Sequence, residues 1–77
     1  MNALEAFEKS LYNDFDRAQA DHIRSVILPS ITADFIKILM DAPLGQHVAE
    51  DYGIDDGSGL IRMEGRNGRI ESVSWTG

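Results

Sequence analysis

The clearest chemical potential in this chain lies in the carboxylates between Ile38 and Ile61, a stretch without lysine or arginine. The stretch holds five acidic residues, namely Asp41, Glu50, Asp51, Asp55 and Asp56. Unopposed negative charge attracts and steers a partner with a basic surface. Tyr52 lies among these acids and is of a residue type enriched at interfaces. The pattern predicts a partner-binding surface made of these five acids and Tyr52. The alternative is an acidic loop that only keeps the protein in solution.

Metal and thiol chemistry lack the residues they need. The chain has no cysteine, which excludes disulfides, thiolate nucleophiles and cysteine-ligated metals. His47 has Glu50 and Asp51 nearby in the sequence, but these are only two types of ligand, and no clear further partner accompanies them. His22 falls on an apolar stripe, where a core or interface histidine is expected. The run that starts at Asp51 departs from a calcium loop at its third, sixth and twelfth positions. We therefore predict no metal and no cofactor.

Catalysis, nucleic-acid binding and membrane insertion are also disfavoured. No serine stands in a nucleophile-elbow sequence, no glycine loop carries the lysine of a phosphate site, and 77 residues leave little room for a catalytic cleft. The formal charge of -6 opposes direct nucleic-acid binding, although Arg62, Arg66 and Arg69 lie close together in the sequence. The longest apolar run, 38–40, is too short to cross a membrane, and the first residues do not lead us to expect a secretory signal. We expect a cytoplasmic protein that is not an enzyme.

Apolar periodicity predicts two helices that position these side chains. The first helix is predicted at about residues 3–27, with Asn2 as its N-cap and an end imposed by Pro29. One face of it carries Leu4, Phe7, Leu11, Phe15, Ala18, His22 and Val26. The second helix is predicted at residues 30–42 and ends before Pro43. Its apolar residues cover most of its circumference, so it should be buried on most sides. They are Ile31, Phe35, Ile36, Ile38, Leu39, Met40 and Ala42.

The rest of the chain is predicted to be an acidic connector over residues 43–59 and a hairpin over residues 60–75. A short helix from Gln46 to Tyr52 is expected within the connector. The hairpin turns at Asn67-Gly68. A three-residue turn with a bulge at Gly68 keeps Glu64 away from Glu71. It also places four apolar side chains on one face, which burial should favour. These are Ile61, Met63, Val73 and Trp75.

Together these elements predict one α+β domain over residues 1–77. It consists of a long N-terminal helix, a buried second helix, the acidic connector and a two-stranded antiparallel hairpin packed on the helices. A two-stranded hairpin cannot cover the apolar faces of both helices, so a homodimer is expected. The residues predicted for self-association are Phe7, Leu11, Phe15, Phe35 and Trp75.

These features predict a small acidic protein, without enzymatic activity, that inhibits or modulates another protein. The partner would present a basic surface to the acidic and aromatic side chains. If the partner binds nucleic acid, the carboxylates would take the place of phosphates. A protein of this size and charge is plausible as an accessory inhibitor that a phage or a mobile element carries. The alternative is a homo-oligomeric structural or assembly subunit whose helices form the working surface.

Overall fold

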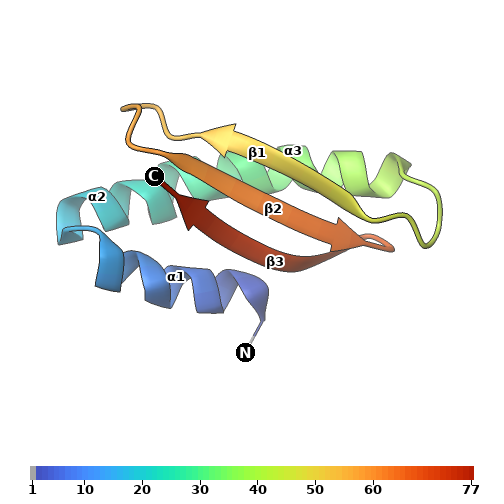
Figure 1. The fold of residues 1–77 in the computed structure, drawn as a ribbon, viewed down its shortest axis with the longest axis horizontal. Helices are drawn as coiled ribbons and strands as arrows, with labels where there is room; N and C mark the ends of the chain where they lie inside the picture. Colours follow the sequence, from blue (N-terminus) through green and yellow to red (C-terminus); the bar gives the residue numbers. More distant parts are fainter. Residues whose placement is uncertain (1) are drawn as a thin grey trace.

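The computed structural model describes residues 2–77, which form helices and a three-stranded antiparallel sheet (Figure 1). The elements in chain order are α1 (Ala3–Asp14), α2 (Arg17–His22), the π-helical segment η1 (Ile23–Ile27), α3 (Leu28–Asp41), β1 (Val48–Gly53), β2 (Leu60–Arg66) and β3 (Arg69–Thr76). The expected α+β class is confirmed. The expected two-stranded hairpin is wrong, because residues 48–53 add a third strand. Within residues 2–77, every helix is too short or too polar to cross a membrane.

The predicted helix over residues 3–27 is wrong because the chain turns at Phe15 and Asp16. Both residues have extended backbones. The Asp16 carboxylate accepts a hydrogen bond of 2.9 Å from the backbone N–H of Gln19, and so caps a new helix. An aspartate followed three residues later by glutamine resembles a capping box. The turn lets the Phe15 ring pack edge-on against Trp75, with ring centroids 4.6 Å apart.

The predicted helix boundary at Pro29 is also wrong, because α2, η1 and α3 form one continuous helix over residues 17–41. At about 1.5 Å per residue it is about 37 Å long, close to the 38 Å longest dimension of the molecule. In η1 the N–H of Leu28 bonds to the carbonyl of Ile23, five residues earlier. Proline has no N–H, and its ring crowds the carbonyl four residues before it. The wider π turn just before Pro29 relieves this crowding and lets the helix continue.

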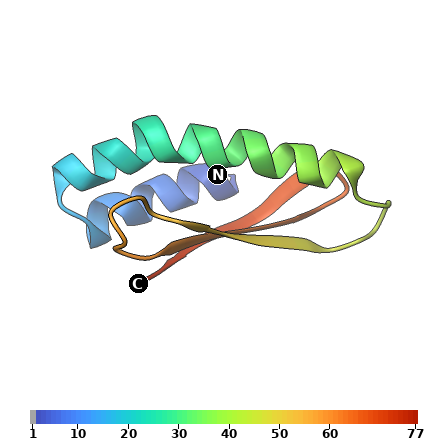
Figure 2. The same ribbon diagram turned by 90° about the horizontal axis from the view of Figure 1, so that it is seen from above.

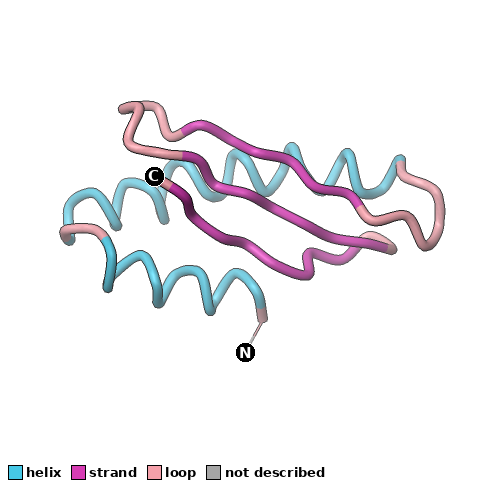
Figure 3. Tube along the Cα trace, in the orientation of Figure 1, coloured by secondary structure: helices cyan, strands magenta, loops and turns pink. Residues whose placement is uncertain are grey.

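All helices cover the same face of the sheet, as Figure 2 shows. The strand order is β1-β2-β3, and the strands follow one another as an antiparallel meander (Figure 3). Tyr52 of β1 pairs with Ile61 of β2, which pairs with Trp75 of β3. Ile61 is fully buried, so this row faces the helices. The short helix predicted from Gln46 to Tyr52 is wrong, because pairing with β2 satisfies the backbone groups of this segment as a strand.

The predicted inward face of the hairpin is confirmed: Ile61 lies opposite Trp75 and Met63 opposite Val73. The predicted three-residue turn is wrong, because the turn has two residues, Asn67 and Gly68. Their φ angles of 55° and 74° are those of a turn that matches strand twist. A register shift between Glu64 and Gly65 then brings the apolar residues of the two strands opposite each other. Burial of the apolar face therefore fixes the register, while a bulge inside the ladder provides the extra residue.

The bulge also keeps the like charges of Glu64 and Glu71 apart, which the predicted three-residue turn would have done. Glu64 lies opposite Ser72 rather than opposite Glu71. The Ser72 hydroxyl donates a hydrogen bond of 3.1 Å to the Glu64 carboxylate. A pair of like charges across the strands is thus replaced by a hydrogen bond.

The core is one cluster between the helices and the sheet. Only one stripe of α3 belongs to this core. The expectation that this helix is buried on most sides is therefore wrong. Ile36 and Ile38 are 41% and 39% exposed, and Met40 is 71% exposed. One sheet can cover only one side of a helix. The buried apolar residues are Phe7, Leu11, Ala20, Ile23, Ile27, Leu28, Ile31, Phe35, Leu39, Ile54, Ile61 and Met63.

Gly65→Ala is expected to lower the free energy of unfolding by about 1–3 kcal/mol. Gly65 is buried where α3 packs on β2, and a Cβ there would lie 3.1 Å from both methyl carbons of Leu39 and against the carbonyl of Arg69. Gly53→Ala is the control, since its Cβ would meet only a Leu60 methyl, at 3.9 Å. Urea denaturation compares the two variants. Equal stability would contradict the close approach of Leu39 in α3 and of the Arg69 carbonyl in β3 to Gly65.

Candidate functional site

The structure does not gather the six predicted partner-binding residues on one surface. Asp41 ends α3, whereas Asp55 and Asp56 lie in the loop between β1 and β2. These two places are at opposite ends of the molecule in Figure 1. Glu50 and Asp51 are neighbours in β1, so their side chains point to opposite faces of the sheet. The predicted set is therefore divided among the end of α3, the β1–β2 loop and the two faces of β1.

Two of the predicted residues are engaged within the chain. Asp51 lies opposite Arg62, whose Nη1 is 3.3 Å from its carboxylate oxygens. A guanidinium thus offsets its charge. Tyr52 is half-buried, and its hydroxyl is buried without a hydrogen-bond partner among residues 2–77. Burial raises the pKa of Tyr52, and the Glu50 and Asp34 carboxylates raise it further. Asp51 is thus exposed but paired with Arg62, and the Tyr52 hydroxyl is enclosed within the chain.

A different set of acids does come together, and Gln19 is at its centre. The Asp16 carboxylate accepts from the Gln19 backbone N–H at 2.9 Å, and the Asp56 carboxylate accepts from the Gln19 side-chain amide at 2.7 Å. Residues 37 positions apart in the sequence are joined by this second bond. The turn between α1 and α2 is thereby held against the loop between β1 and β2.

A second bridge joins the same two segments. His22 Nε2 lies 3.4 Å from an oxygen of Asp55, and both side chains are largely exposed. Next to His22, the Asp21 carboxylate accepts a hydrogen bond from the Tyr12 hydroxyl. We define the acidic end of the molecule as Asp16, Asp21, Asp55 and Asp56. Two of these residues, Asp55 and Asp56, belong to the predicted surface; Asp16 and Asp21 do not.

The acidic end carries negative charge at neutral pH. Hydrogen bonds from the hydroxyl and backbone N–H of Ser58, and from the Gln19 amide, hold the pKa of Asp56 below its ordinary value. The ionised Asp56 carboxylate therefore stabilises the fold fully above the ordinary pKa of a carboxyl group. This stabilisation is lost as the pH falls through the lowered pKa of Asp56. Among the residues that the structure describes, no lysine or arginine forms an ion pair with the four carboxylates. His22 is their one ion-pair neighbour in that range.

The five residues predicted for self-association lie in or against the core of the single chain. Phe7, Leu11 and Phe35 are at most 2% exposed. Phe15 and Trp75 are half-buried and pack against each other. The third strand and the turn after α1 add cover to the apolar faces of the helices within one chain. These five side chains therefore contribute to packing within the chain.

The face of the sheet away from the helices carries a hydrogen-bonded network centred on Glu64. Its carboxylate lies 3.1 Å from His47 Nε2, accepts from the Ser72 hydroxyl at 3.1 Å and lies 3.8 Å from Arg62 Nε. His47 thus pairs with Glu64 rather than with the acids near it in sequence. Nucleophilic catalysis by serine needs a base next to the hydroxyl. Here the carboxylate separates Ser72 from His47, so the network serves to link the strands. No group of three possible metal ligands converges anywhere in residues 2–77.

The pKa of Tyr12 provides a test of the contact at the acidic end. The hydrogen bond to Asp21 favours the neutral phenol and raises this pKa. The Tyr12–Asp21 hydrogen bond therefore stabilises the fold below the ordinary tyrosine pKa of about 10, and this stabilisation is lost as the pH rises through the raised pKa of Tyr12. In a Tyr52→Phe background, Tyr12 is the only tyrosine, and its ultraviolet titration should have a midpoint above about 10.

Asp21→Asn should move that midpoint back toward about 10, and Asp34→Asn is the control that should leave it unchanged. An ordinary Tyr12 midpoint in the presence of Asp21 would contradict the contact.

Comparison of the chain with protein-family models, with curated proteins and with solved structures finds no match in any of the three. The contacts within this chain are therefore the observations from which a function can be inferred. Two features stand out among residues 2–77. One is the acidic end, where carboxylates from two distant segments meet. The other is the exposed apolar flank of α3, which includes Ile36 and Met40.

Proposed function

We propose that this protein is a small non-enzymatic binding protein that recognises a partner with a basic surface through its acidic end. The supporting observation is the meeting of the α1–α2 turn with the β1–β2 loop through the Gln19–Asp56 and His22–Asp55 contacts. The acids of two separate segments thereby act on the same region of solvent. Binding of this kind would inhibit or modulate the partner by covering its basic surface. Where the partner binds nucleic acid, the carboxylates would occupy positions of phosphates.

The proposal rests on the sum of the charges rather than on any one of them. A single exposed ion pair contributes only about 0–1 kcal/mol. Several like charges within one Debye length, about 8 Å at physiological salt, produce a field that speeds association. Backbone and side-chain hydrogen bonds hold Asp16 and Asp56 in place. Part of the cost of ordering these side chains is therefore met before a partner arrives.

Self-assembly is the second candidate function, and exposed apolar residues favour it. Met40 and Leu44 are 71% and 91% exposed at the C-terminal end of α3 and just beyond it. A homo-oligomer would bury such side chains in an interface between copies. Light scattering distinguishes the two candidates: a mass of 8.5 kDa at high protein concentration excludes assembly, and a large closed oligomer excludes a free acidic end as the main working surface.

The test compares two variants, each with three acids replaced by neutral amides, one at the acidic end and one elsewhere. Asp21→Asn, Asp55→Asn and Asp56→Asn remove charge at the acidic end. Immobilised wild-type protein should capture a basic protein from lysate of the cells that make it, at low salt but not at high salt. The triple variant should lose this capture, because the local field that attracts the partner is gone.

The control variant removes the same amount of charge elsewhere. Asp34→Asn, Asp41→Asn and Glu50→Gln also take three charges from the formal -6 of the chain, and all three residues are exposed. Capture should persist in this variant. Equal loss in both triple variants would mean that only net charge matters, and would contradict a binding site at the acidic end.

A further inference from the structure

The outer strand β1 leaves one rim of the sheet without a neighbouring strand among residues 2–77 (Figure 3). Ile54, directly after β1, donates its backbone N–H to the carbonyl of Gly59 at 2.9 Å and so faces the side of β2. The backbone groups of an antiparallel strand face its two sides alternately. Three residues of β1 therefore direct their N–H and C=O groups away from β2, namely Ala49, Asp51 and Gly53. We call this row the free edge of β1.

The opposite rim of the sheet is protected, whereas the free edge is regular. In β3 the bulge leaves Glu71 without a partner in β2, and α1 packs alongside this strand (Figure 1). Bulges and covering elements are devices by which natural sheets block the addition of a strand at an edge. β1 has no register shift, no lysine and no proline. Its free edge is therefore open to pairing with another extended segment.

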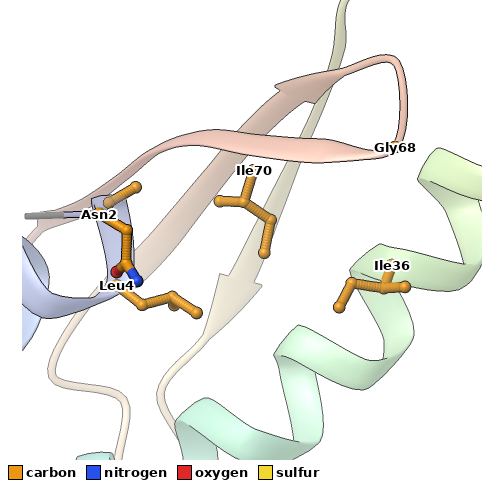
Figure 4. Close-up of a pocket in the computed structure, with 6 residues that line it drawn as sticks. Asn2, Leu4, Ile36, Gly68 and Ile70 are labelled. Carbon is orange, nitrogen blue, oxygen red and sulfur yellow. The ribbon is translucent and has the colours of Figure 1, made fainter.

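The flank of α3 beside β1 offers an apolar contact to such a segment. Asp34 lies near Tyr52 of β1, because its carboxylate helps to raise the pKa of this tyrosine. Ile38 is one helical turn beyond Asp34 on the same flank and is 39% exposed. Ile36 lies on the other flank, at a hollow of about 230 Å³ that α1 and β3 also line (Figure 4). A strand at the free edge would therefore lie over Ile38 and away from Ile36.

Charge opposes a second copy of the chain as the occupant of the free edge. When two such edges meet, outward-facing residues must pair with outward-facing residues. In the two symmetric antiparallel registers with the largest overlap, either Asp51 or Glu50 lies opposite the same residue of the copy. Like charges directly opposite each other destabilise a strand pair. A copy would also bring the same formal charge of -6. The occupant that fits is therefore a segment of another protein.

The acidic end gives this segment a charge and a direction. The chain passes from Gly53, the last residue of β1, into the loop that holds Asp55 and Asp56. A segment antiparallel to β1 starts its pairing opposite Gly53, so the residues before the paired stretch would lie beside this loop. Lysine or arginine there would meet carboxylates that no lysine or arginine pairs with among residues 2–77. Antiparallel pairing also continues the order of this sheet.

We infer that the free edge of β1 binds an extended segment of a partner protein as an added antiparallel strand, with basic residues just before the paired stretch and an apolar side chain over Ile38. The position of the basic residues rests on the function proposed above, whereas the strand pairing rests on the free edge alone. The acidic end would attract the partner, and backbone hydrogen bonds would hold it.

The experiment uses three synthetic peptides, each with a stretch of alternating threonine and valine, which favours an extended backbone. The first peptide has two lysines before this stretch, and the second has them after it. The third is the first peptide with methyl groups on the threonine nitrogens. In the inferred pairing the threonines lie opposite the free edge and the valines over α3, so the methyl groups remove the backbone bonds and keep the charge.

Hydrogen exchange of the backbone amides, followed by nuclear magnetic resonance with the full chain, locates the added strand. Saturation with the first peptide should slow the exchange of three amides about tenfold or more, those of Ala49, Asp51 and Gly53. The amides of Glu50 and Tyr52 are the internal control, because they already face β2 and should exchange slowly with and without the peptide. The methylated peptide should protect none of the three.

Two matched variants test the apolar contact, with affinity for the first peptide measured by calorimetry. Ile38→Ser should weaken binding about fivefold, because the added strand would cover this side chain. Ile36→Ser is the control, since Ile36 is 41% exposed on the other flank of α3. It should change the affinity less than about twofold. Equal effects of the two variants would overturn the contact with Ile38.

Three results would overturn the strand pairing. They are unchanged exchange of the three amides, protection of amides in β3 instead, and equal affinity for the methylated and unmethylated peptides. Protection that appears without peptide as the protein concentration rises, together with a doubled mass, would show that a second copy occupies the free edge, and would overturn the assignment to another protein.

The lysines test the proposed function separately. The second peptide should bind more weakly than the first, and the double variant Asp55→Asn with Asp56→Asn should remove this difference. Equal affinity of the two peptides for the wild type, or a difference that persists in the double variant, would overturn the position of the basic residues and count against the proposed function. Protection of the three amides would still support the strand pairing in that case.

Discussion

The turn at Phe15 and Asp16 is the constraint on which the rest of this molecule depends. It divides what the apolar pattern presents as one long helix and sends α1 back over β3 (Figure 1). The side chains on either side of the turn secure it in two ways. Asp16 caps the helix that follows, and Phe15 packs edge-on against Trp75. A straight helix over residues 3–27 would leave β3 without its helical cover and would remove Phe7 and Leu11 from the core.

The acidic end follows from this turn. The turn places Gln19 and His22 beside the β1–β2 loop, where they bond to Asp56 and Asp55, and Gln19 also bonds to Asp16 at the cap of α2.

Local signals in the sequence explain which elements could be predicted. The apolar stripe through Ile31, Phe35 and Leu39 is enough to place a helix there, and burial alone determines which hairpin residues face inward. The spacing of Asp16 and Gln19 marks the helix start that the periodicity conceals. Pro29 is a misleading signal, because a π turn can absorb it.

The remaining features depend on contacts between distant segments. The segment from Val48 to Tyr52 becomes a strand because β2 lies beside it, and its two adjacent acids give no strong local preference for strand. The acidic end has the same origin: the α1–α2 turn and the β1–β2 loop are unrelated in the sequence. The sequence singles out Asp55 and Asp56 by charge, but only the fold shows that Gln19 links Asp16 to Asp56 and that Asp41 lies at the far end of α3.

The most direct test of this account is the nuclear Overhauser spectrum of the chain around Phe15. The account predicts contacts between the Phe15 ring protons and the Trp75 indole, and an interruption of the sequential amide contacts of a helix at Phe15 and Asp16. Unbroken helical amide contacts through these two residues, without contacts to Trp75, would contradict it.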